Sequence, residues 1–120
     1  MKQANDDKAL RQKIFQLQAE ICKALGNPTR MAIVDRLGVG EIAAADLIAG
    51  LGISKANLSK HMTILVHGGI VESRRDGRQI LYRLIDSEIR KACAVMSSVL
   101  YRRLKRGERL ASAIDMVKAS

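Results

Sequence analysis

The sequence predicts a mainly α-helical fold with one small β-hairpin, and three observations lead to this class. Aromatic residues make up only 2% of the chain, so the core must be built from Leu, Ile, Val, Ala and Met, which suit packed helices better than a sheet. Apolar residues recur at three- and four-residue spacing along most of the chain, as they do in amphipathic helices. The exception is residues 70–83, where two strand-like runs flank Asp76-Gly77.

Size and charge narrow the classes of partner. With 120 residues, the chain is expected to form a single domain, 1–120, around one modest core. It carries 21 Lys and Arg against 12 Asp and Glu, a net charge of +9, which favours a polyanionic partner, either nucleic acid or an anionic membrane surface. No apolar run approaches the roughly 18 residues of a membrane span, and the N-terminus lacks the features of a signal peptide. We therefore expect a cytoplasmic protein that does not use a membrane.

Three helices are predicted in the first half of the chain. The first covers 8–25, where Leu and Ile recur at helical spacing, and residues 1–7 are expected to fray. Asn27-Pro28 then predicts a helix start, because Asn is a favoured N-cap and Pro suits the first helical position. This second helix points Met31, Ile33, Val34 and Leu37 inward and ends near Gly38. A third short helix is expected over 41–49, closed by Gly50 or Gly52.

A fourth helix is predicted over 54–67, with Ser54 as its N-cap. Ile53 and Leu58 stand at the positions of a hydrophobic staple, which sets the angle at which the chain enters the helix. One face is apolar (Leu58, Met62 and Leu65). The other face carries small polar and basic residues and no acid: Lys55, Asn57, Ser59, Lys60 and Thr63.

After Gly68-Gly69 the spacing of apolar residues changes from that of a helix to that of a strand. The runs 70–75 and 78–83 alternate like strands, and Asp-Gly between such runs is typical of a type I′ hairpin, because both turn positions need positive φ. A long helix is then expected to start after Asp86 and run to Arg106. Gly107 is expected to break it, with a last short helix over 108–117.

Together these elements predict a winged helix-turn-helix that binds DNA. The helices at 41–49 and 54–67 are joined by a Gly-containing turn, residues 51–54, which is a helix-turn-helix signal at 41–67. The major groove of B-DNA admits one helix, whose N-terminal residues reach the base edges. The hairpin at 70–83 is then a wing that offers cations to phosphates or to the minor groove. These cations are Arg74, Arg75 and Arg78.

The chain resembles the ArsR-type (ArsR/SmtB) winged-helix repressors. The resemblance is carried by ALGNPTRMAIVDRL at Ala24–Leu37 and ADLIAGLGISKANLSKHMTILVHGGIVESRRDGRQILYRL at Ala45–Leu84. It implies a homodimer joined through the first and last long helices, here 8–25 and 86–106, which leaves operator DNA when an inducer binds. It also implies DNA-contacting positions in the fourth helix and the wing. These positions are Ser54, Lys55, Asn57, Ser59, Lys60, His61, Arg75 and Arg78.

Many members of this family sense metals, but the ligands at their two usual positions are absent here. Where the third helix of such members carries a Cys-x-Cys-Asp-Leu motif, this sequence has Ala43, Ala44 and Ala45 before Asp46-Leu47. Where the last long helix carries Asp, His, His and Glu, this sequence has Asp86, Glu88, Val99 and Arg102. We expect no metal site and no cofactor.

Two cysteines are the remaining candidates for a sensor. Cys22 lies on the first predicted helix and Cys93 on the fifth, the two elements that the family uses for dimerisation. If the thiols meet, within or between subunits, they could form a disulfide or polysulfide bridge or bind a thiophilic metalloid such as arsenite. The alternative is that both are small buried apolar residues with no sensing role.

Other classes of function fit less well. The sequence has no phosphate-binding Gly-rich loop, no nucleophile elbow and no His-Glu-x-x-His motif, so an enzyme is not expected. A non-specific architectural nucleic-acid binder would explain the charge but not the polar face of 54–67. A repressor controlled by a ligand that does not react with thiols is also compatible with the sequence.

Overall fold

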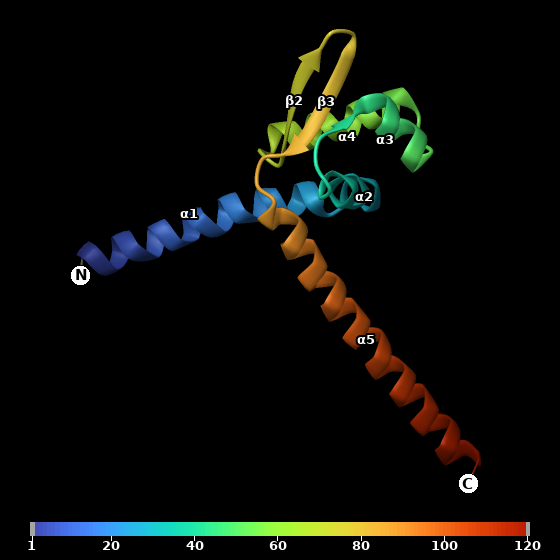
Figure 1. The fold of residues 1–120 in the computed structure, drawn as a ribbon. Coiled ribbons are helices and arrows are strands. Elements are labelled where there is room, and N and C mark those ends of the chain that lie inside the picture. The colour runs from blue at the N-terminus through green and yellow to red at the C-terminus, as the bar shows by residue number, and fades with distance from the viewer. Residues whose placement is uncertain (1, 120) are drawn as a thin grey trace. The chain divides into compact units, whose positions relative to one another are not determined.

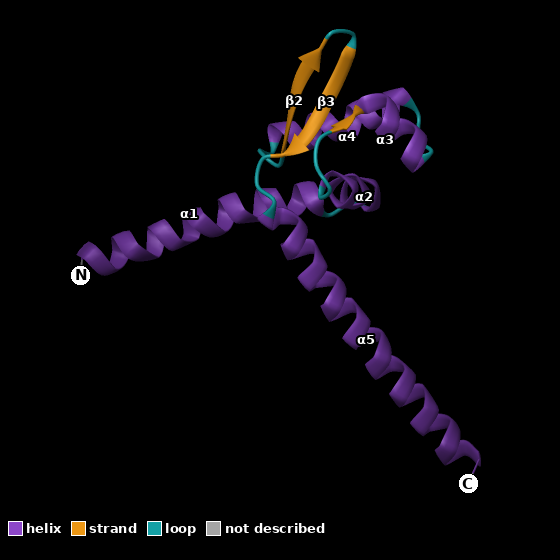
Figure 2. Cartoon of the chain, viewed as in Figure 1, coloured by secondary structure: helices purple, strands orange, loops and turns teal. Residues whose placement is uncertain are grey.

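The computed structural model describes residues 2–119, which divide into two compact units at Ser87 and Glu88. The first unit holds four helices and three strands, and the second is one long helix (Figures 1 and 2). The elements of the first unit are α1 (Lys2–Leu25), α2 (Pro28–Leu37), β1 (Ile42–Ala43), α3 (Ala44–Leu51), α4 (Lys55–His67), β2 (Val71–Asp76) and β3 (Gln79–Leu84). The second unit is α5 (Glu88–Ala119). The predicted mainly α fold with a small β-hairpin is confirmed.

Helix α1 packs on the rest of its unit only at its C-terminal end. Ala24 is its one buried residue, and most of α1 extends beyond α2, α3 and α4 (Figure 1). The expectation that residues 1–7 fray is wrong for residues 2–7, which are helical, while Met1 lies outside the described residues. The physical reason is local: this segment contains no Gly or Pro and begins with Lys, Gln and Ala, which are good helix formers.

The core of the first unit is aliphatic and lies where α2, α3 and α4 meet the sheet. The predicted inward residues Ile33, Val34 and Leu37 of α2 are buried. Met31 was expected to be inward but is exposed. Among residues 2–119 the buried apolar residues are Ala24, Ile33, Val34, Leu37, Ala43, Leu47, Leu58, Met62, Leu65, Ile70 and Val71.

The sheet contains a strand that the sequence did not predict. Its order is β1-β3-β2, and β1 pairs antiparallel with β3 through Ile42 opposite Tyr82 and Ala43 opposite Leu81. The predicted helix over 41–49 therefore starts late, at Ala44. Pairing with the edge of β3 holds Ile42 and Ala43 extended, and for Ala43 this tertiary contact overrides a preference for helix.

The turn of the hairpin lies one residue later in the chain than predicted. Asp76 pairs with Gln79, so the two-residue loop is Gly77-Arg78 rather than Asp76-Gly77. Gly77 has a φ of 61°, whereas no residue other than glycine has a positive φ among the described residues. A type I′ turn needs positive φ at both loop positions, so Arg78 excludes it. The pattern of φ matches a type II′ turn, which takes Gly at its first position.

Helix α5 is continuous over 32 residues. The predicted break at Gly107 and the separate helix at 108–117 are wrong, because Gly107 lies inside α5. A glycine inside a helix costs about 1 kcal/mol relative to alanine, and the good helix formers on both sides of it (YRRLKR and ERLASA) outweigh this cost. No helix within residues 2–119 is both long enough and apolar enough to cross a bilayer.

The cap at the start of α2 makes a testable contribution to stability. The side-chain oxygen of Asn27 accepts hydrogen bonds from the backbone N–H groups of Thr29 (2.9 Å) and Arg30 (3.1 Å). We expect Asn27→Ala to lower the free energy of unfolding by about 0.5–2 kcal/mol, measured by urea denaturation. Asn57→Ala is the matched control, since Asn57 lies exposed inside α4, and should change it by less than about 0.5 kcal/mol. Equal effects would show that Asn27 acts other than as a cap.

Candidate nucleic-acid interface

The turn between α3 and α4 is built by one glycine and one serine. Gly52 has a φ of 65° and its N–H donates to the carbonyl of Ile48 at 2.9 Å, which ends α3 in the left-handed conformation that favours glycine. Ser54 then caps α4: its hydroxyl oxygen accepts from the N–H of Asn57 at 3.0 Å. The predicted Ser54 cap is therefore confirmed. Its O–H is still able to donate to a ligand.

Helix α4 separates its side chains into two faces. Leu58, Met62 and Leu65 are buried, which confirms the predicted inward face. The opposite side, which we call the reading face, consists of Lys55, Asn57, Ser59, Lys60 and Thr63, and all five are exposed. The hydroxyl of Thr63 donates to the carbonyl of Ser59 at 2.8 Å, so its oxygen is left mainly as an acceptor.

His61 lies at the border of the reading face, four positions after Asn57, but its side chain is buried. Only 7% of its surface is exposed, and its Nδ1 lies 3.2 Å from an Nη of Arg30. An Arg nitrogen can only donate, so the imidazole accepts at Nδ1 and carries its proton on Nε2. Burial is the main reason that the pKa of His61 lies below its ordinary value of 6.5, and the charges of Arg30 and Lys60 lower it further. Because the imidazole is buried, His61 is not among the DNA contacts proposed below.

The wing presents its three arginines differently. Successive residues of a strand point to opposite sides of the sheet, so Arg74 and Arg75 lie on different faces of β2. The face that carries Arg75 also carries Ser73 and, across the hairpin, Tyr82. The other face carries Arg74, opposite Leu81 of β3, which in turn pairs with Ala43 of β1. Arg78 lies in the exposed loop at the tip.

Arg74 is held by an acid that sequence reasoning missed. Its Nε and Nη2 donate to the two carboxylate oxygens of Glu41 at 2.8 and 2.7 Å. This hydrogen bonding is the main reason that the pKa of Glu41 lies below its ordinary value of 4.5. On the same face Arg83 pairs with Glu72. Nothing in the local sequence around Glu41 indicates a partner 33 positions away, because the contact depends on the register of β1 against β3.

Four of the six Lys and Arg residues in α4 and the hairpin are left without such partners. Among residues 2–119, Lys55, Lys60, Arg75 and Arg78 make no ion pair with an acid. All four are exposed, and no acid occurs anywhere in α4. The reading face and the Arg75 side of the wing therefore form an electropositive surface in which hydrogen-bonding groups are exposed.

The cysteines and the usual metal positions of the ArsR-type proteins lie elsewhere. Cys22 is exposed near the end of α1, Cys93 is half-buried on α5, and neither forms a disulfide. Ala43 lies in β1, while Ala44 and Ala45 open α3. Within the described range 2–119, no three His, Cys, Asp or Glu residues come together in a way that could hold a metal ion.

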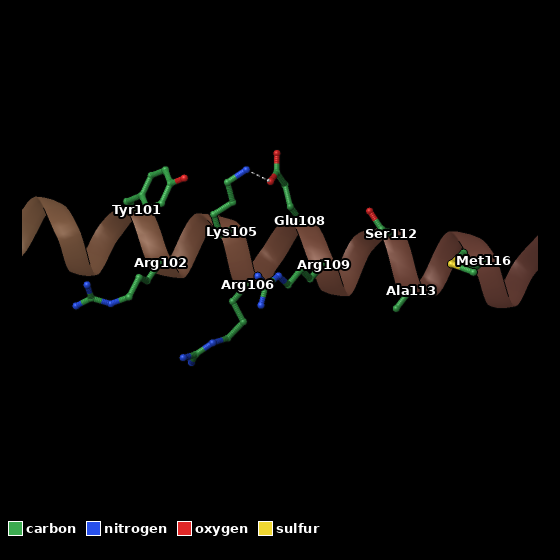
Figure 3. Close-up of a pocket in the computed structure, with 9 residues that line it drawn as sticks. All are labelled: Tyr101, Arg102, Lys105, Arg106, Glu108, Arg109, Ser112, Ala113 and Met116. Carbon is green, nitrogen blue, oxygen red and sulfur yellow. Dashed lines mark ion pairs between the residues drawn. The ribbon is translucent and has the colours of Figure 1, made fainter.

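The second half of α5 forms a basic, open surface. Figure 3 shows side chains that project from this one helix, among them Tyr101, Lys105 and Glu108. Lys105 pairs with Glu108 at 3.2 Å and lies 6.0 Å from the centre of the Tyr101 ring. Because every residue of this surface comes from the same helix, it has no opposing wall within the unit and does not enclose a ligand.

Comparison with known proteins agrees with this arrangement. A helix-turn-helix domain family matches residues 25–74. The HTH-type transcriptional regulator Rv0081 of Mycobacterium tuberculosis is 33% identical over 94 residues, which are 74% of this chain and 79% of that protein. Its crystal structure superposes with a TM-score of 0.70 at 31% identity, covering 78% of this chain and 94% of that one.

Two further relatives specify the type of regulator. The arsenical resistance operon repressor of Staphylococcus xylosus is 39% identical over 64 residues, 53% of this chain and 62% of that protein. The solution structure of the Mycobacterium bovis fragment Mb0332 has a TM-score of 0.71 at 28% identity, covering 80% of this chain and 89% of that one. It is described as a homodimeric winged helix-turn-helix DNA-binding domain from a possible ArsR-family regulator. The present chain belongs to the ArsR-type family of transcriptional regulators.

For this ArsR-type regulator the elements now have functional names. Helices α3 and α4 form the helix-turn-helix and β2 with β3 forms the wing, which puts α4 in the position of the recognition helix of this fold. The relatives named here are transcriptional regulators. The family resemblance expected from the sequence is confirmed, as is the winged helix-turn-helix.

Proposed function

We propose that this ArsR-type regulator is a homodimeric repressor that binds one double-stranded operator sequence. The observation that carries the proposal is the acid-free reading face of α4 beside a wing whose Arg75 and Arg78 have no acidic partner within residues 2–119. A helix with such a face fits the major groove. Asn57 is suited to base edges, and Lys55 and Lys60 to phosphates or guanine.

A dimer is supported by the apolar side chains that each helix leaves exposed. On α1, Leu10 is 60% exposed and Ile14, Leu17 and Ile21 are also exposed. On α5 the exposed stripe includes Met96, Leu100 and Leu104. Stripes of this size are normally covered by a partner, and the Mb0332 fragment is homodimeric. The two recognition helices would then enter major grooves about one turn (~34 Å) apart on a pseudo-palindromic operator.

For the inducer, we propose a thiol-directed agent that acts on Cys22 and Cys93 in the cytosol. An oxidant would take two electrons and two protons from the thiols to form a disulfide, reactive sulfur would form a polysulfide bridge, and arsenite would bind thiolates. Cys22 is exposed on α1 and neither thiol is in a disulfide, which supports access by such an agent. The competing proposal is that the cysteines are structural and the inducer is not thiol-directed.

Fluorescence anisotropy on DNA from upstream of the gene tests the repressor proposal. We expect binding to that duplex to be at least about 10³-fold tighter than to a scrambled duplex near 0.15 M salt. Changes at Asn57 or Ser59 should alter the preferred sequence more than the salt dependence. Binding without selectivity would instead support the second candidate, an architectural nucleic-acid binder, which the net charge of +9 also suits.

The thiol proposal makes a separate prediction. Polysulfide, peroxide or arsenite should weaken the binding of the reduced wild-type protein to its operator by about 5- to 150-fold in Kd, because a typical coupling is about 1–3 kcal/mol. The same anisotropy assay measures this change. Cys22→Ser and Cys93→Ser should each bind DNA normally but resist release. If both variants are released like the wild type, the cysteines are structural.

A further inference from the structure

A groove of about 350 Å³ lies between the recognition helix and the wing. Helix α4 contributes Ser59, Met62, Thr63, Val66 and His67, and the hairpin contributes Ser73 and Tyr82. Ser73 and Tyr82 are cross-strand partners, so they form one continuous patch on the face of the wing that also carries Arg75. Neither Ser73 nor Tyr82 was predicted from the sequence to be a site residue.

The polar groups of this groove are suited to an anion. No acid lines it, and the hydroxyls of Ser73 and Tyr82 make no hydrogen bond within residues 2–119. Tyr82 is half-buried, and burial raises its pKa above the ordinary value of 10.0, so the hydroxyl stays protonated and able to donate. Met62, which is buried, also lines the groove.

Each of the two elements that line the groove, α4 and the hairpin, also carries an exposed cation. Lys60 lies seven positions before His67 on α4, which places the two on the same side of the helix. Arg75 lies two positions beyond Ser73 on the same face of β2. Neither Lys60 nor Arg75 has an acidic partner in the described chain. Neutral donors on two elements that also carry unpaired cations fit a phosphodiester, which is an extended anion with several acceptor oxygens.

We propose that this groove seats the sugar-phosphate backbone of DNA between recognition helix and wing, with the Tyr82 and Ser73 hydroxyls donating to one phosphate. The proposal rests on the proposed function, since it presumes that α4 enters the major groove. The contact positions the protein on the duplex and carries no sequence information. Tyr82 would therefore set affinity and leave selectivity unchanged.

The experiment compares full-length Tyr82→Phe with the wild type by fluorescence anisotropy on operator and scrambled duplexes. Removal of one hydrogen bond to a charged phosphate from each protomer should weaken binding to both duplexes by at least about 100-fold for a dimer. The slope of affinity against salt should not change, because a neutral donor releases no counterion. Ser73→Ala should act in the same direction. Tyr101→Phe, which alters the other tyrosine of the chain, is the matched control and should bind as the wild type.

A direct readout uses the fact that the chain has two tyrosines. With 3-fluorotyrosine incorporated, the ¹⁹F resonance of Tyr82 should shift when a duplex is added, and that of Tyr101 should not. Inorganic phosphate at the same phosphate concentration should leave both unshifted; an equal shift would reassign the groove to small anions and overturn the proposal. The proposal would also be overturned if Tyr82→Phe bound DNA with wild-type affinity, or if the ¹⁹F resonance of Tyr82 did not shift when the duplex was added. If the wild type bound operator and scrambled duplexes equally well and Tyr82→Phe bound both more weakly, only the proposed repressor function would be rejected.

Discussion

Alanine at Lys55, Lys60, Arg75 and Arg78 together is expected to weaken operator binding by on the order of 10³-fold. Each exposed ion pair with a phosphate is worth about 0.5 kcal/mol, and a dimer would lose eight of them, or about 4 kcal/mol in total. The slope of log K against log salt should fall by about 0.9 for each lost contact. The measurement is anisotropy on the operator duplex between about 50 and 200 mM salt.

The fold should tolerate this change. All four side chains are exposed and lack acidic partners among residues 2–119, so each substitution should alter the free energy of unfolding by less than about 0.5 kcal/mol. A thermal unfolding curve like that of the wild type would show that lost affinity is a loss of contact rather than of structure.

The hairpin supplies its own matched control. One double variant is Arg75→Ala/Arg78→Ala, and the other is Arg74→Ala/Arg83→Ala. Each removes two positive charges from the same hairpin. Arg74 and Arg83 are paired with Glu41 and Glu72 on the other face, so their loss should leave the salt slope nearly unchanged. If both pairs lower the slope equally, the wing acts through net charge and the assignment of Arg75 and Arg78 as contacts is wrong.

The sequence predicted correctly those features that depend on neighbouring residues. Asn27 and Ser54 cap helices through hydrogen bonds to N–H groups two or three positions away, and such short-range geometry can be read from the residue type. The buried side of α4 follows from its period, because Leu58, Met62 and Leu65 fall on one face of any helix. These local features are sufficient to indicate a recognition helix.

Other features depend on contacts between distant segments and could not be predicted. Strand β1 exists because Ile42 and Ala43 meet the edge of β3. The hairpin register, which moved the loop to Gly77-Arg78, also decides that Arg74 meets Glu41 while Arg75 does not. The burial of His61 is a further case, since its helical position is compatible with either face until Arg30 of α2 is placed beside it.

Replacing Arg30, which contacts His61, is expected to lower the stability of the fold. Arg30 donates from Nε to the carbonyl of Ala24 at 2.5 Å and from an Nη to His61. It thereby joins the last turn of α1 to the recognition helix. Arg30→Ala leaves both acceptors, one of them on a buried imidazole, without this donor. We expect the free energy of unfolding to fall by about 2–3 kcal/mol, measured by urea denaturation at pH 7.5. Arg36→Ala is the control, because Arg36 donates from an exposed position to the carbonyl of Gly50 and should cost less.

The same contact predicts how stability depends on pH. Because the pKa of His61 is lowered in the folded state, the unfolded chain takes up the proton first as pH falls. The stabilisation is therefore complete above the ordinary value of 6.5 and is lost as pH falls from there toward the lowered pKa.

His61→Asn tests this directly, because its Oδ1 can accept from Arg30 where Nδ1 did and it does not titrate. Between pH 7 and about 5, above the range in which most carboxylates titrate, the wild type should lose stability and His61→Asn should lose less. His67→Asn, which changes the other histidine of the chain, should keep the wild-type dependence. If His67→Asn flattens the curve and His61→Asn does not, the imidazole beside Arg30 is not the titrating group. In Arg30→Ala the dependence should weaken but persist, since burial lowers the pKa of His61 more than the charge of Arg30 does.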